Sequence, residues 1–225
     1  MLTQAIGELL PSAIGVALSP LPIVAVILIL GTDRARRNGP AFALGWIAGL
    51  VIVSVVVLLV AGDADNPDST TSTSINWLQV GLGVLFLAMA GKEWRSRSKH
   101  GEETEMPRWL ATVDAFSPAK SLGLGVGLSA INPKNLALTA AAGASVAQAG
   151  LSSSESVAAV AVFVVIASAT VAGPVVFYLL ATDRAAGPLA SLKEFMSRHN
   201  AVIMMVVLLV LGAKLLGQGL GGVAT

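Results

Sequence analysis

The chain has 225 residues, of which 55% are hydrophobic and only 12% are charged. A soluble domain of this length carries about twice that share of charge, so the composition excludes an ordinary water-soluble protein and indicates one whose solvent is lipid. The net charge of +1 identifies no partner, and the absence of cysteine excludes disulfides, thiolate metal sites and thiol chemistry.

Six apolar runs, joined by short polar connections, account for almost the whole chain. Each is long enough to cross a bilayer, and a backbone in hydrocarbon must satisfy its own hydrogen bonds, so each run is expected to be a helix. The sequence therefore predicts an all-α integral membrane protein with six transmembrane helices and no separate catalytic domain. The runs are 9–31, 41–62, 75–91, 121–149, 157–182 and 200–222.

The first run is interrupted at Ser19-Pro20-Leu21-Pro22. Proline lacks a backbone N–H and leaves an earlier carbonyl without its helical partner. A break of this kind exposes polar backbone groups to whatever lies at the centre of a bundle. Ser19, Pro20 and Pro22 are therefore candidate substrate-binding residues, although prolines are also common in membrane helices without any such role.

Positive charge alternates between the connections. Twelve of the fourteen Lys and Arg residues lie in three of them, and the intervening connections 63–74 and 150–156 hold none. Basic connections stay in the cytoplasm, which predicts a multi-pass protein of the inner (plasma) membrane with both termini outside. The cations are Arg34, Arg36 and Arg37, then Lys92, Arg95, Arg97, Lys99, Arg108 and Lys120, then Arg184, Lys193 and Arg198.

The connection 92–120 is the one sizeable polar stretch and is predicted to link two halves of the molecule. Its simplest interpretation is a solvated cytoplasmic loop. Within it, Met106 to Phe116 has apolar residues at helical spacing, which favours a short helix lying on the inner leaflet.

The fourth run holds the most informative motif, Asn132-Pro133-Lys134-Asn135. It combines a helix-breaking proline with two amides and a lysine near the expected middle of the membrane. A lysine at that depth is costly and commonly marks a pathway, so it favours a cation that faces an anionic group such as a carboxylate, phosphate or sulfate. The alternative is a structural lysine that bonds the carbonyls freed by the kink.

The two interrupted helices also resemble each other. Gly15 to Ser19 can be laid on Gly125 to Ser129 with four identities in five positions, which adds Ser129 to the candidate residues. Because three is an odd number of spans, a repeat of three helices is inserted upside down relative to the first. Inverted repeats with helices broken near the midplane are typical of secondary transporters.

These patterns predict the domain organisation and exclude several functions. Residues 1–91 are expected to form the first three-helix repeat, 92–120 the cytoplasmic linker and 121–225 the second repeat. No nucleophile with a base, phosphate-binding loop or metal-ligand spacing is present, so we expect no enzyme activity, metal, cofactor or nucleic-acid partner. The glycine-rich helix faces permit a homodimer.

Three motifs, Leu18 to Ile23, Ala41 to Trp46 and Asn132 to Leu136, resemble the actinobacterial family of peptidoglycolipid-addressing proteins. That family includes the sulfolipid- and glycopeptidolipid-addressing proteins and is grouped with the lysine-exporter superfamily. The resemblance implies a six-helix fold of two repeats and a role in delivering cell-envelope glycolipids. It implies large lipid transporters and biosynthetic enzymes as partners, and it supplies no catalytic residues.

The leading hypothesis is an exporter that moves an envelope glycolipid, or another anionic amphipathic substrate, across the inner membrane by alternating access. One alternative is an exporter of amino acids or small solutes. Another is an accessory subunit of a lipid biosynthesis and export complex that transports nothing itself. The predicted substrate-binding residues are Ser19, Pro20, Pro22, Ser129, Asn132, Pro133, Lys134 and Asn135.

Overall fold

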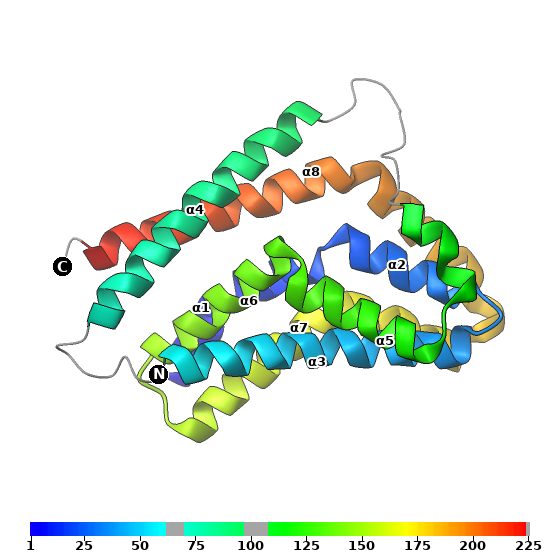
Figure 1. Ribbon diagram of the computed structural model, residues 1–225, viewed down its shortest axis with the longest axis horizontal. Helices are drawn as coiled ribbons and strands as arrows, with labels where there is room; N and C mark the ends of the chain where they lie inside the picture. Colours follow the sequence, from blue (N-terminus) through cyan, green and yellow to red (C-terminus); the bar gives the residue numbers. More distant parts are fainter. Residues whose placement is uncertain (62–69, 97–107, 224–225) are drawn as a thin grey trace.

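A computed structural model describes residues 1–61, 70–96 and 108–223, and these ranges contain helices and no strand (Figure 1). The all-α prediction is confirmed. The elements in chain order are α1 (Leu2–Ala17), α2 (Pro20–Leu30), α3 (Ala35–Ala61), α4 (Thr70–Ser96), the 3-10 helix η2 (Arg108–Ala115), α5 (Pro118–Val126), the π-helical turn η3 (Gly127–Ile131), α6 (Pro133–Gln148), α7 (Ser153–Leu180) and α8 (Thr182–Val223).

Among the described residues, three helices are long and apolar enough to cross a membrane on their own: α3, α7 and α8. The pair α1 and α2 makes a fourth if it counts as one span bent by 52°. The chain is thus an integral membrane protein. A count of six spans stays a prediction, which also requires α4 and the interrupted helix from α5 to α6 to cross the bilayer.

Both predicted interruptions occur. The first helix stops at Leu18 and resumes as α2, with Pro20 in its first turn, where the missing N–H costs no hydrogen bond. The second runs through α5 into the π-helical turn, becomes extended at Asn132 and resumes with Pro133 as the first residue of α6. Each interrupted helix is followed by long helices, α3 and α4 in the first half and α7 and α8 in the second.

The described parts of the basic connections that precede α3, α5 and α8 lie together at one end of the molecule (Figure 1). Arg36, before α3, donates to Thr182 Oγ1, before α8. Asn38, in the first turn of α3, donates to the carbonyl of Phe116, which precedes α5. The chain termini lie at the opposite end (Figure 1). This grouping is what alternating charge requires, and the side of the membrane that each end occupies stays a prediction.

The last helix is longer than expected. The basic connection between the fifth and sixth runs is helical, and α8 extends through it. Ala185, Leu189 and Met196 explain the difference, because they lie on one face of that segment and are buried. An amphipathic face continues a helix even where the other face is charged.

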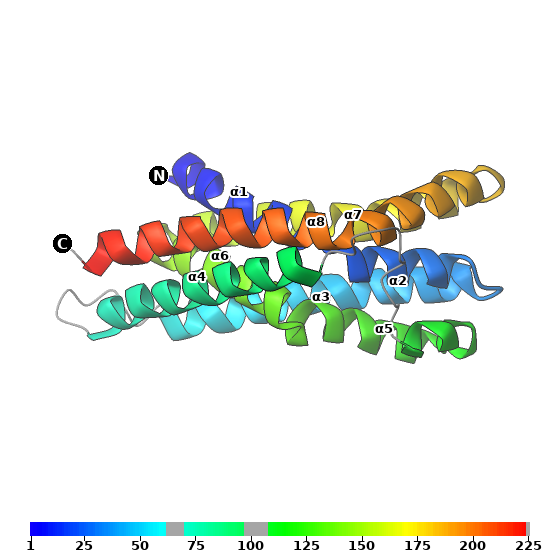
Figure 2. The ribbon, with the colours of Figure 1, turned by 90° about the horizontal axis from the view of Figure 1, so that it is seen from above.

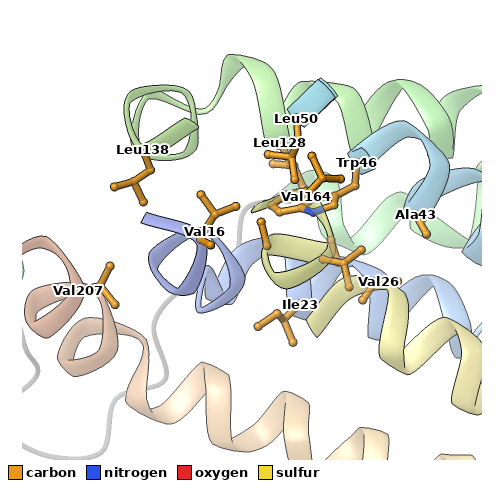
Figure 3. Close-up of a cluster of buried hydrophobic side chains, with 14 of the residues drawn as sticks. Val16, Ile23, Val26, Ala43, Trp46, Leu50, Leu128, Leu138, Val164 and Val207 are labelled. Atoms are coloured by element: carbon orange, nitrogen blue, oxygen red, sulfur yellow. The ribbon is translucent and has the colours of Figure 1, made fainter. Parts of the chain in front are cut away.

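The halves are interleaved in the core. In the first half, α1 packs on α7 and α6; in the second, α5 packs on α3. Figure 3 shows Trp46 and Leu50 of α3 beside Leu128 of η3 and Val164 of α7. Glycines bring α3 and α5 together: a Cβ on Gly45 or Gly125 would lie well inside van der Waals distance of the other helix's backbone.

Outside this core, α4 packs mainly along α8, and the two run side by side in both views (Figures 1 and 2). Gly83 and Gly212 face each other where these helices cross.

Two predictions fall partly on residues that the structure does not describe: the outer connection 63–74 and the linker 92–120. The described part of the linker includes the end of α4 and the short helix η2, which overlaps the helix predicted from Met106 to Phe116.

Candidate functional site

The two helix breaks meet at Ser19. Its position precedes α2, but its side chain does not cap that helix. Instead, Ser19 Oγ donates to Asn135 Oδ1 at 2.7 Å and accepts a hydrogen bond from Lys134 Nζ at 2.8 Å. One hydroxyl therefore joins the break of the first half to the break of the second.

Lys134 is buried among neutral groups. The residue is only 4% exposed, and its second contact is Met204 Sδ of α8, 3.6 Å from Nζ. No carboxylate within the described ranges lies at salt-bridge distance from it. Placing a lysine deep in a membrane protein costs about 3 kcal/mol on insertion scales, and a buried charge is normally paired. The site therefore offers a cation without a counter-charge.

Asn135 and Asn132 hold the second break in shape. Asn135 Nδ2 donates to the carbonyl of Leu128 at 2.9 Å, which satisfies an acceptor in the irregular turn before α6. Asn132 Oδ1 accepts from the backbone N–H of Lys134 at 3.1 Å, the usual arrangement for an asparagine that caps a helix. Both amides thus fix the position from which the Lys134 side chain projects.

Ser129 does not join this cluster, although the sequence repeat pairs it with Ser19. Its hydroxyl donates within its own helix, to the carbonyls of Gly125 and Val126 at 3.0 and 3.1 Å. It is fully buried against α3, where Gly49 leaves room for it. Ser129 therefore packs between the halves, and its predicted substrate-binding role stays a prediction.

The three candidate prolines shape the breaks without entering the cluster. Pro20 and Pro22 are buried in the first turn of α2, whereas Pro133 is exposed at the start of α6. Of the eight candidates, Ser19, Lys134 and Asn135 come together, and Asn132 lies beside them as the helix cap.

Two residues at the breaks were not among the candidates. Thr170 of α7 donates to the carbonyl of Ala17, the last residue of α1. Met204 of α8 contacts Lys134. Both lie in apolar runs without a proline or a charge beside them, so no local pattern distinguishes them; only the packing of distant helices brings them to the breaks.

A second lysine in the expected spans, Lys214, has a different environment. It is half-buried, and its Nζ donates to the backbone carbonyl of Glu8, which connects α8 to α1. This contact agrees with a structural role and makes Lys214 a useful comparison for Lys134.

The chemistry that the cluster offers is recognition of an anion. One ammonium, one hydroxyl and two amides converge at the breaks. Within the described residues, no group of three His, Cys, Asp or Glu side chains is placed to hold a metal ion.

A family model described as "Sap, sulfolipid-1-addressing protein" matches residues 9–221, a range that includes both broken helices and the whole cluster. No curated protein and no solved structure matches the chain.

Proposed function

The chain belongs to the sulfolipid-1-addressing protein family, and from this premise we propose that it binds an anionic membrane lipid where its helix breaks meet and helps to move it across the inner membrane. The chemistry is binding and translocation without covalent change. The family match and the apolar helices together identify the chain as a membrane protein tied to lipid handling. The lipid and the transport step are the proposal.

The observation that carries this function is the environment of Lys134. A buried ammonium held by Ser19 Oγ and Met204 Sδ has no counter-charge among the described residues, and an anionic headgroup would supply one. The family description names a sulfolipid, and the sulfur–oxygen headgroup of such a lipid is an anion at neutral pH. A sulfate group accepts several hydrogen bonds, and the Lys134 ammonium has three N–H donors, of which only one is given to Ser19 Oγ.

The interleaved helices support a rocking movement. Because α1 packs on α7 and α5 packs on α3, each half holds the interrupted helix of the other. Movement between the halves would change the relation between the two breaks, and Ser19 and Lys134 are the point at which they touch. Such movement around a fixed site is how transporters with paired broken helices expose it to each side in turn.

The test is lipid profiling of the envelope of cells that lack the protein, complemented with wild type or with Lys134→Gln. We expect wild type to restore an anionic envelope lipid to the outer surface. Lys134→Gln should restore about tenfold less or none, because each 1.4 kcal/mol of lost binding energy reduces occupancy tenfold. Each form must first be shown to reach the membrane at an equal level.

Lys214→Gln is the matched control, since it removes the other lysine of the expected spans and should leave delivery of the lipid intact. If Lys134→Gln restores delivery as fully as wild type does, the lysine is structural and the proposal is wrong. Loss of an amino acid or another small solute from the exported pool, with the lipids unchanged, would instead support the small-solute exporter.

A further inference from the structure

Residues 134–138 of α6 face residues 204–207 of α8 along a seam. Contacts between side chains hold the two helices together there more than close approach of their backbones does. The backbones of these helices make little close contact along the described part of α8. Lys134 and Met204 bridge the seam at its start. About one turn further along both helices, Leu138 of α6 and Val207 of α8 approach the same point over Gly15 of α1. Figure 3 shows Leu138 and Val207 on the same side of Val16, with Leu138 drawn above Val207.

The second break has one polar, buried side and one apolar, exposed side. Lys134 and Asn135 project inward, whereas Ile131 is 73% exposed and Pro133 is also exposed. Met204 is half-buried on the side of α8 that carries the buried Val207 and Leu208, whereas Val206 is exposed on the opposite face. In a bilayer the exposed part of the Met204 side chain meets lipid while its sulfur contacts the Lys134 ammonium, so this one side chain reaches from the site to the surface of α8.

We propose that the seam between α6 and α8, closed by Met204, is a lateral entrance through which an anionic amphiphile places its headgroup on Lys134 while its acyl chains stay in the bilayer. This inference rests on the proposed function and adds the route and the shape of the substrate. Every methylene that leaves lipid for water adds to the cost of an aqueous route, so a side entrance suits a long-chain lipid. Methionine suits a closing residue, because its unbranched side chain changes conformation readily.

The absence of cysteine from the chain makes a direct test possible. Met204→Cys is purified and placed in phosphatidylcholine vesicles, where its labelling by a membrane-soluble alkyl maleimide is compared with labelling by a water-soluble sulfonated thiol reagent. The probes are sulfatide and galactosylceramide, which share a sugar and a ceramide and differ in the sulfate. Binding of sulfatide is measured separately by native mass spectrometry.

The expected result has four parts. The membrane-soluble reagent labels Met204→Cys faster than the water-soluble one. Sulfatide slows that labelling several-fold, galactosylceramide does not, and the protection disappears when Lys134→Gln is added. Met205→Cys is the matched control, because the next residue points about 100° away around the helix, and its labelling should be insensitive to sulfatide.

The failures are distinguishable. If sulfatide binds in a Lys134-dependent manner but does not protect Met204→Cys, the entrance is elsewhere and the proposed function stands. If sulfatide shows no Lys134-dependent binding, the entrance and the proposed function both fail.

A second variant tests the same proposal in cells if too little Met204→Cys protein can be purified for labelling. Met204→Trp should block the seam and reduce lipid delivery in cells as severely as Lys134→Gln does, while Met205→Trp should retain delivery. Full delivery by Met204→Trp would overturn the lateral entrance.

Discussion

At the scale of single residues, the Ser19 hydroxyl is the contact on which both helix breaks depend. It satisfies an amide oxygen of Asn135 and an ammonium of Lys134, and each of the three residues is at most 4% exposed. Polar groups at this depth have few other partners, so removing the hydroxyl takes the donor from Asn135 Oδ1 and leaves Lys134 Nζ with only the Met204 sulfur.

Ser19→Ala should therefore destabilise the protein by about 1–3 kcal/mol, the cost of an unsatisfied buried group. The measurement is thermal unfolding of the purified protein in detergent. Thr139→Val is the comparison, because the Thr139 hydroxyl is fully buried and has no partner among the described residues. Valine removes an unsatisfied group of similar shape, so stability should equal or exceed that of wild type. Equal stability of Ser19→Ala and wild type would show that the contact is dispensable.

The sequence marked three residues that the structure brings into contact, and each of them lies near a helix breaker; their substrate-binding role stays a prediction. Ser19, Lys134 and Asn135 are each adjacent to a proline or one residue away from it, and they form the cluster. Met204 and Thr170 have no helix breaker beside them. Met204 contacts a residue 70 positions away in the chain and Thr170 one 153 positions away, so no local pattern predicts either contact. The sequence repeat made Ser129 a candidate, but its hydroxyl donates to a carbonyl of its own helix and does not reach the cluster.

At the scale of elements, glycine determines which helices can approach each other. α3 and α5 cross where Gly45 and Gly125 leave no room for a side chain, whereas Gly123, on the same helix as Gly125, has open space around it. Two glycines only two residues apart therefore have different structural importance.

Gly125→Ala should destabilise the protein by about 1–3 kcal/mol, because the added methyl group meets the backbone of α3 and the helices must separate. Gly123→Ala should be neutral or slightly stabilising, since alanine favours a helix more than glycine does. Thermal unfolding of both variants in one detergent makes the comparison. Equal stability of the two would show that α3 and α5 are less tightly packed than the structure has them.

The breaks were predictable at this scale, but the helix ends were not. Prolines and asparagines interrupt a helix through their own local chemistry, so such a break can be predicted from the residue types alone. The start of α8 at Thr182 depends instead on burial of Ala185, Leu189 and Met196 against other elements. Their periodicity is short and is masked by the charges of Arg184, Lys193 and Arg198 among them.

At the scale of the whole molecule, the two ends differ in charge. Arg36 meets Thr182 at one end, and the other end holds the start of α7, where Ser152 and Glu155 form a capping box. The alternation of charge along the sequence predicts that the first end is cytoplasmic.

Single cysteines test this orientation in intact cells. A maleimide that does not cross membranes should label Ser154→Cys directly, because the start of α7 is expected outside. It should label Arg36→Cys only after the membrane is opened. Labelling of Arg36→Cys in intact cells would reverse the orientation, and labelling of both would contradict a single transmembrane topology.

The grouping of the basic connections followed from the sequence, whereas the interleaving of the halves did not. The charge of a side chain is known from its residue type. The pairing of apolar helix faces depends instead on shape complementarity between helices that are distant in the sequence. No pattern in the sequence of α1 predicts that it packs on α7, and none in α5 predicts that it packs on α3.

The interleaving also separates the order of synthesis from the order of folding. Ser19 leaves the ribosome 115 positions before Lys134, and Ala17 leaves it 153 positions before Thr170. At roughly 5–20 residues per second, the first broken helix waits on the order of ten seconds for the residues that complete it. During that interval α2 can already pack on α3, but α1 lacks α6 and α7, on which it packs, so the native bundle assembles only when translation is nearly finished.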